Sequence, residues 1–302
     1  MSSHTSKRRV ADNFLIVVLA VALLVLCGAV ISLSWRRHSS ETALSEEQYQ
    51  LITSLANSVS AKVATTRIRV GIFDVDPSNG NATKDLQTLL AAESTFAWKS
   101  VSAASIREGA LNEFDVIIFP GGYAPRQAEL LGDEGKEIVK DFVRAGGGYV
   151  GICGGAFLAT AKYDCGMALI NVQPLTGNVD VHGNGLVSMA ARGTGTVKIE
   201  LTGAGKRIFG DTLGIVDILY SGGPIFIPAH LSGLSESVPL ATFRNEVWTY
   251  EPQRGTMVNT PAIIAGRFGR GRAIIFSPHP DVTIGLEFLV RHAILATASS
   301  GG

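Results

Sequence analysis

Two patterns of hydrophobic positions divide the chain. One uninterrupted apolar run lies near its start, and from residue 67 short apolar runs alternate with segments that carry apolar residues at helical spacing. The run Val116–Phe119 is wholly apolar, as expected of a strand that is buried on both faces. Strands are predicted at residues 68–73, 96–101, 116–119 and 149–152, with helices at 81–92 and 134–145. This alternation predicts an α/β domain with a doubly wound, mostly parallel sheet.

The second half of this region has more β-structure. Residues 170–250 show β-like alternation, and residues 262–267 and 273–277 flank a turn of glycine and arginine, which predicts a hairpin. Residues 283–296 have the spacing of a closing amphipathic helix. No linker is visible after residue 67, so residues 67–302 are expected to form one domain.

The early apolar run, Phe14–Trp35, contains no charged residue and is long enough to cross a bilayer, which takes about 20 apolar residues. Three basic residues at 7–9 precede it and two at 36–37 follow, which favours an N-terminus on the inside. The alternative is a buried core helix. We therefore expect an inside tail at 1–13, a single-pass anchor at 14–35 and a soluble domain on the periplasmic or extracytoplasmic side.

Residues 36–66 are polar around a segment of helical spacing. We interpret them as a stalk between the membrane and the domain. The alternative is that this segment packs on the domain.

The amino-acid composition limits which classes of partner and ligand are expected. The chain has 26 basic and 26 acidic residues and no basic stripe, which argues against a nucleic-acid partner. Its three cysteines form neither a disulfide framework nor a cluster with metal-ligand spacing, so no metal site is expected. Nothing in the sequence indicates a cofactor.

A lone cysteine lies on a tight corner between a predicted strand and a predicted helix. Gly151–Gly155 reads G-I-C-G-G, the spacing of a nucleophile elbow centred on Cys153. Such a turn needs small residues two before and two after the nucleophile, and both are glycine. The corner would place the thiol at a helix N-terminus, where unpaired N–H groups stabilise a thiolate. The alternative is a packing turn with a structural cysteine.

Two more loops follow predicted strands, and in open α/β sheets sites form beyond the carboxyl ends of the strands. In Phe119–Tyr123 the paired glycines let backbone N–H groups approach a ligand, so Gly122 and Gly154 could hold an oxyanion. In Phe276–Asp281, His279 could hold a thiolate as an ion pair and later protonate a leaving group, with Asp281 fixing its ring. Each loop alone has a plainer interpretation as a surface turn.

Taken together, the segments FPGG, GGYVGICGGAF and FSPHPD resemble the class I glutamine amidotransferase superfamily. The closer similarity is to the biotin-protein ligase N-terminal-domain-like family and covers about residues 67–296. Its motifs are matched at Gly121–Tyr123, Gly147–Cys153, Tyr220–Pro224 and Pro278–Asp281.

This resemblance implies a flavodoxin-like fold and a triad of Cys153, His279 and Asp281. It further implies a substrate pocket lined by Gly121, Tyr123, Tyr220, Ser221, Gly222 and Gly223.

The chain departs from the superfamily in two places. Glutamine-hydrolysing members usually carry Gly, then His or Met, then Gln after the nucleophile, whereas this chain has Gly155, Ala156 and Phe157. The apolar Phe157 cannot supply the hydrogen bonds of that Gln, which argues against glutamine as the substrate. The triad acid is usually Glu, and here it is Asp281.

The sequence therefore supports a membrane-anchored cysteine hydrolase or amidotransferase-like enzyme that acts on a small-molecule or peptide amide; it identifies no protein partner. A second hypothesis is a binding or scaffolding module that keeps the pocket without turnover. A third is redox sensing by Cys153 with Cys165 as the resolving thiol.

Overall fold

The computed structural model describes residues 44–62, 67–74, 82–176, 178–180, 186–188, 193–248 and 255–298. Within them the chain builds a nine-stranded sheet in the order β2-β1-β3-β4-β13-β12-β11-β8-β9. Two small two-stranded sheets pair β5 with β10 and β6 with β7; their strands are β5 (Val172–Pro174), β10 (Phe226–Pro228), β6 (Asn178–Asp180) and β7 (Leu186–Ser188).

Five neighbouring strands of the large sheet are parallel. They are β1 (Ile68–Phe73), β2 (Phe96–Val101), β3 (Val116–Phe119), β4 (Gly148–Ile152) and β13 (Gly271–Phe276). Their order along the sheet is the 2-1-3-4-5 order of flavodoxin-like folds, with β13 in the fifth place. The parallel part of the prediction is confirmed for this half of the sheet.

The other four strands are antiparallel. They are β12 (Pro261–Phe268), β11 (Val238–Phe243), β8 (Thr194–Leu201) and β9 (Ile215–Ser221). The hairpin predicted around residues 269–272 is the β12–β13 pair, and it turns the sheet from parallel to antiparallel pairing. The β-rich middle of the chain thus extends the parallel sheet at one edge.

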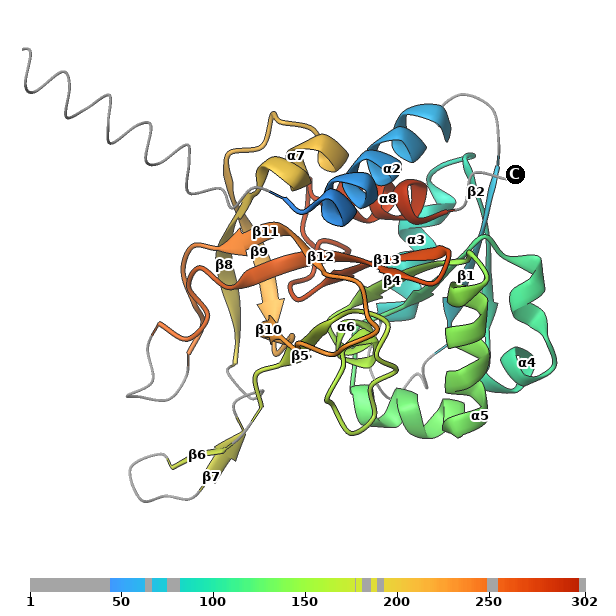
Figure 1. The fold of residues 1–302 in the computed structure, drawn as a ribbon, viewed down its shortest axis with the longest axis horizontal. Coiled ribbons are helices and arrows are strands. Elements are labelled where there is room, and N and C mark those ends of the chain that lie inside the picture. The colour runs from blue at the N-terminus through green and yellow to red at the C-terminus, as the bar shows by residue number, and fades with distance from the viewer. Residues whose placement is uncertain are drawn as a thin grey trace, which may run out of the picture. The chain divides into compact units, whose positions relative to one another are not determined.

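Helices cover both faces of the sheet (Figure 1). One face packs against α2 (Glu46–Lys62), α3 (Ala82–Ala91), α7 (Gly203–Phe209) and α8 (Glu287–Thr297). The other packs against α4 (Ala103–Arg107), the short 3-10 helix η2 (Ala110–Glu113), α5 (Ala124–Arg144) and α6 (Gly154–Ala159). Strand β3 supplies both cores, because Val116 and Ile118 join the first and Ile117 and Phe119 the second.

Helix α2 packs on the domain, against α7 and α8. Leu51, Ile52 and Leu55 are buried in the core. The guanidinium of the buried Arg272, on β13, donates to Ser58 Oγ at 2.8 Å and to the Ala298 carbonyl at 2.6 Å. The boundary expected at residue 67 therefore moves to Glu46, where the compact unit begins. The many polar residues of this stretch obscured, in the sequence, the one apolar face that packs on the domain.

Two helix boundaries also differ from the sequence prediction. Helix α5 begins at Ala124, ten residues before the predicted start, and it is broken at Gly132, whose φ is +63°. Helix α8 begins at Glu287 and not at residue 283, because Gly285 has a φ of +84° and Thr283 is bonded to the preceding loop.

The anchor predicted at residues 14–35 lies outside the described residues. Among the residues that are described, no helix has the length and apolar character that a membrane crossing requires.

Candidate active site

The three predicted loops meet at the carboxyl ends of adjacent strands. Strands β3, β4 and β13 are neighbours in the sheet, so the loops that follow them lie at one edge. The N–H of Cys153, after β4, donates to the Phe276 carbonyl on β13 at 2.8 Å. The N–H of Gly155 donates to the Pro120 carbonyl, after β3, at 3.1 Å. These backbone bonds fix the cysteine corner between the other two loops.

Cys153 occupies a strained backbone conformation, with φ +50° and ψ −103°. Glycine surrounds it because the turn leaves no room for side chains. A Cβ at Gly151 would lie 2.5 Å from the Gly155 carbonyl oxygen, and one at Gly154 would collide with the Gly122 carbonyl. The tight strand-to-helix turn that the glycines predict is thus present, and helix α6 starts at the next residue.

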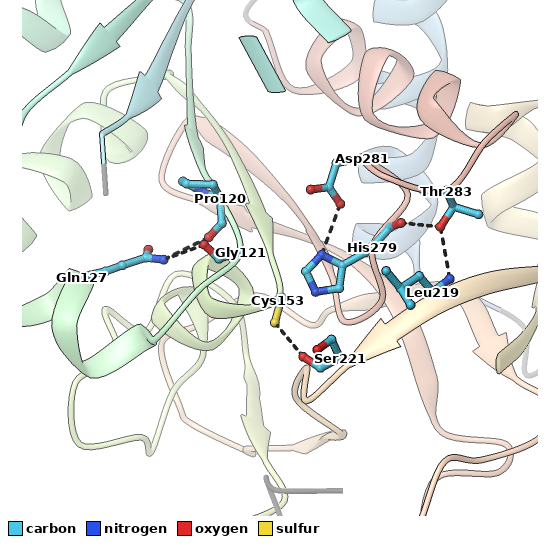
Figure 2. Close-up of polar contacts among 9 residues, drawn as sticks. All are labelled: Pro120, Gly121, Gln127, Cys153, Leu219, Ser221, His279, Asp281 and Thr283. Atoms are coloured by element: carbon cyan, nitrogen blue, oxygen red, sulfur yellow. Dashed lines mark hydrogen bonds and ion pairs between the residues drawn. The ribbon is translucent and has the colours of Figure 1, made fainter. Parts of the chain in front are cut away.

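His279 is held by hydrogen bonds to an antiparallel strand far from it in sequence. The backbone N–H of His279 donates to the Leu219 carbonyl on β9 at 2.8 Å. Thr283 Oγ1 donates to the His279 carbonyl at 2.6 Å and accepts from the Leu219 N–H at 3.1 Å (Figure 2). Thr283 and Leu219 therefore position the histidine. No sequence signal singled them out, because β9 and the histidine loop meet only in the fold.

The imidazole and the carboxylate predicted to form a pair are in contact. Nδ1 of His279 lies 3.4 Å from Oδ1 of Asp281, and the two side chains are 12% and 1% exposed. Figure 2 shows the ring between the Asp281 carboxylate and Cys153. Burial by itself lowers the pKa of His279, but the Asp281 carboxylate and then the Cys153 thiol raise it to about 10. These contacts favour the imidazolium form of the ring.

The sulfur of Cys153 lies next to the end of β9. Sγ donates to the Ser221 carbonyl at 3.4 Å, and the residue is 7% exposed (Figure 2). The Ser221 hydroxyl in turn lies 2.8 Å from Thr194 Oγ1 on β8. The antiparallel extension of the sheet therefore supplies one wall of the site.

A buried glutamine holds the loop predicted to bind an oxyanion. Nε2 of Gln127, on α5, donates to the Pro120 carbonyl at 3.0 Å and to the Gly121 carbonyl at 3.4 Å (Figure 2). Gly122 has a φ of +125°, which favours glycine, and its carbonyl packs on Gly154. Gln127 was missed by the sequence reasoning, because its role depends on how α5 packs beside this loop.

A cavity of about 510 Å³ opens over the cysteine. Its wall contains seven predicted site residues, namely Gly121, Gly122, Tyr123, Cys153, Ser221, His279 and Asp281. The sequence did not predict the other lining residues, which are Ala82, Asp85, Leu219 and Val282. Four separate strand ends, those of β3, β4, β9 and β13, and the start of α3 thus enclose one space.

Three predicted binding residues lie elsewhere. Tyr220 is fully buried, its hydroxyl donates to the Gly223 carbonyl at 2.8 Å, and its ring packs edge-on against Phe243. Gly223 packs against the Ser277 carbonyl, and neither it nor Gly222 lines the cavity. The Tyr220 motif therefore shapes the turn that carries the pocket wall, and the expectation that Tyr220 lines the pocket is wrong because alternate residues of β9 face the core.

Cys153 and Cys165 are both free thiols. The pKa of the half-buried Cys165 thiol is raised, and burial is the main cause. No disulfide joins these two described residues, which is the observation that would have favoured the redox hypothesis.

Several solved structures are similar to this chain. A protein described as ThuA-like from Bacteroides uniformis is 10% identical, with a TM-score of 0.52 over 78% of this chain and 91% of that one. A cytoplasmic protein from Salmonella typhimurium is 12% identical, with a TM-score of 0.49 over 77% and 100%. A glutamine amidotransferase from Thermotoga maritima is 11% identical, with a TM-score of 0.47 over 76% and 83%. At such identities the likeness concerns the fold alone.

The sequence comparisons identify the family. No curated protein matches the chain. The model of the family described as "Biotin-protein ligase, N terminal" matches residues 75–294, which include the cysteine corner, the glycine loop and the histidine loop. Because the match spans more than half of the chain, this protein belongs to the biotin-protein ligase N-terminal family.

Proposed function

We propose that the domain is a cysteine-dependent enzyme that cleaves or transfers an amide-type C–N bond, with Cys153 as nucleophile, His279 as acid–base and Asp281 as the group that orients His279. One observation carries the proposal. The strained cysteine corner and the buried His279–Asp281 pair, which come from different strand ends, open into the same cavity.

The reaction would proceed through a thioester. The Cys153 thiolate attacks the amide carbonyl carbon, and the N–H groups of Gly122 and Gly154 are proposed to hold the oxyanion. The His279 imidazolium gives its proton to the leaving nitrogen as the C–N bond breaks. Water then attacks the thioester, His279 takes its proton, and the carboxylic acid leaves as the thiolate is restored.

Glutamine is not the proposed substrate. Phe157 stands where glutamine-hydrolysing relatives carry a hydrogen-bonding Gln, and here it is 7% exposed and packs against the Tyr163 ring at 5.2 Å between centroids. It does not line the cavity. The pocket therefore lacks that contact to a glutamine side chain.

A second candidate function is a binding module without turnover. The observation that favours it is the hydrogen bond of the Cys153 thiol, which donates to the Ser221 carbonyl. In this arrangement the S–H bond is directed at the carbonyl, so it must turn toward His279 before the proton can be transferred to the ring.

We also propose that residues 14–35 anchor the protein in a membrane in single-pass form, with the domain on the extracytoplasmic side. The uncharged apolar run and its basic flanks support this proposal.

The test is covalent trapping on the detergent-solubilised full chain. The protein is incubated with a panel of aminoacyl and peptide amides and esters, quenched in acid, and digested for mass spectrometry. An acyl group on the peptide that contains Cys153, absent from Cys153→Ala and retained in the matched Cys165→Ala control, supports the enzyme. Acyl-enzyme that still forms in Cys153→Ala would refute it, and binding of amides without any acyl-enzyme favours the binding module.

A further inference from the structure

The cavity over Cys153 is acidic. Two carboxylates line it, Asp281 after β13 and Asp85 on α3, and no lysine or arginine is among its described lining residues. His279 is the cationic group in the wall, and it faces Cys153, so a thiolate would cancel its charge. The two carboxylates then leave the space with negative charge.

Asp281 is buried, and the His279 ring is its ion-pair partner. The residue is 5% exposed, and neither carboxylate oxygen has a hydrogen-bond partner of good geometry among the described residues. Its only close charge there is Nδ1 of His279, 3.4 Å from Oδ1. A buried carboxylate with unused acceptor capacity is costly, and it favours a cation or an N–H donor brought by a ligand.

The environment of the Asp85 carboxylate also contains little positive charge. Burial is the main reason that the pKa of Asp85 is raised, and the Asp281 charge raises it further, while Lys84 acts in the opposite direction. Lys84 is exposed and does not line the cavity. Asp85 is only partly buried, so a ligand can reach it, whereas Asp281 contributes its field from deeper in the wall.

The aromatic and aliphatic residues that line the cavity favour an organic cation. Tyr123 lines the mouth of the cavity and is 66% exposed, and Val282 beside Asp281 is also exposed. An aromatic face next to carboxylates is a common environment for ammonium and guanidinium groups, because the ring quadrupole attracts a cation.

We infer that this site selects amides that carry an ammonium or guanidinium group close to the reacting carbonyl, and that Asp85 determines this specificity by contacting the cation. The inference rests on the proposed function, because it assumes that the reacting bond lies at Cys153. It adds a residue, Asp85, and a substrate class that neither the cysteine corner nor the histidine loop implies.

The test measures charge selection at Cys153 with three thiol reagents of the same reactive group. They are the methanethiosulfonates with a trimethylammonium-ethyl, a sulfonatoethyl and a methyl substituent. In each case the thiolate attacks the sulfenyl sulfur, a mixed disulfide forms and methanesulfinate leaves. The protein is the full chain in detergent with Cys27→Ser and Cys165→Ser, so that Cys153 alone reacts.

The readout is the rate constant of Cys153 with the cationic reagent divided by its rate constant with the anionic reagent. This ratio is then normalised by the same ratio measured for free 2-mercaptoethanol. A carboxylate about 6 Å away in a water-like dielectric changes the rate for each charged reagent about threefold in opposite directions, so its loss changes the ratio about tenfold. We expect a normalised ratio above about ten that falls about tenfold in Asp85→Asn, persists in Asp85→Glu, and is unchanged in the exposed control Asp133→Asn.

A normalised ratio near one, or one that Asp85→Asn leaves unchanged while circular dichroism shows a folded protein, overturns the inference. The uncharged methyl reagent separates this outcome from failure of the proposed function. If its rate is slow and insensitive to His279→Ala, the enzyme proposal fails whatever the charge ratio shows. If its rate is fast and depends on His279 but the ratio is near one, only the specificity inference fails.

Discussion

Replacement of His279 by alanine tests how strongly the imidazolium stabilises a Cys153 thiolate. The pKa of His279 rises from 6.5 to about 10 although burial alone lowers it, so its favourable contacts exceed the cost of burial by about 5 kcal/mol. The Asp281 carboxylate and the Cys153 sulfur share this energy. By reciprocity of the coupling, removal of the ring removes whatever part of this energy the sulfur provides, and a part of about 1.4 kcal/mol corresponds to a tenfold change in the reactivity of Cys153.

The assay is the rate of alkylation of Cys153 by iodoacetamide, an uncharged reagent, at pH 6 to 9. The full chain carries Cys27→Ser and Cys165→Ser in every variant. We expect His279→Ala to slow alkylation at pH 6 by about tenfold or more, with a smaller effect at pH 9. The matched control is His292→Ala on α8, because that imidazole contacts the Phe288 carbonyl and does not line the cavity.

One result would refute this reasoning. If His279→Ala and the parent react at the same rate across the whole pH range, no thiolate–imidazolium pair forms, and the cysteine corner is a packing feature. Equal slowing by His292→Ala would instead show that the effect comes from a general loss of folding.

Two further predictions concern stability. Arg272→Met removes the guanidinium that joins α2 and α8 to the sheet, and it leaves the Ser58 hydroxyl and the Ala298 carbonyl without this donor. The free energy of unfolding, measured by urea denaturation, should therefore fall by about 2–4 kcal/mol. A loss no larger than that of the exposed control Arg270→Met would contradict this role of Arg272. The second concerns pH: since the folded pKa of His279 is raised above its unfolded value of 6.5, its stabilisation is fully present below pH 6.5 and is lost as pH rises through about 10. The stability advantage of the parent over His279→Gln should therefore shrink from pH 6 to pH 10, and an advantage that grows with pH would show that the sign is wrong.

The cysteine corner could be predicted from the sequence because its geometry is local. A sharp strand-to-helix turn needs small residues at fixed offsets, and Gly151 and Gly155 stand at those offsets around Cys153. The parallel strands could be predicted for a similar reason, since wholly apolar runs such as Val116–Phe119 occur where both faces of a strand are covered. Strand β13 joins this parallel set, which brings His279 beside the corner.

The binding residues were harder to predict, because a motif does not show which way a side chain points. The segment Tyr220–Pro224 matches the family pattern, yet Tyr220 faces the core and Ser221 alone of these residues lines the cavity. Gln127 and Thr283 hold the site through contacts that depend on the packing of α5 and on the pairing of β9 with the histidine loop.

The sequence by itself determined the α/β class, the family, the strained cysteine turn and the order of the three loops along the chain. The class and the turn follow from periodicity and from steric rules that act over a few residues, and the family follows from the resemblance of its motifs. Only the tertiary structure decided that α2 belongs to the domain and that the sheet continues through four antiparallel strands. It alone placed Asp85 in the wall of the cavity, because α3 and the loop after β13 lie far apart in sequence and meet only when both pack on the sheet.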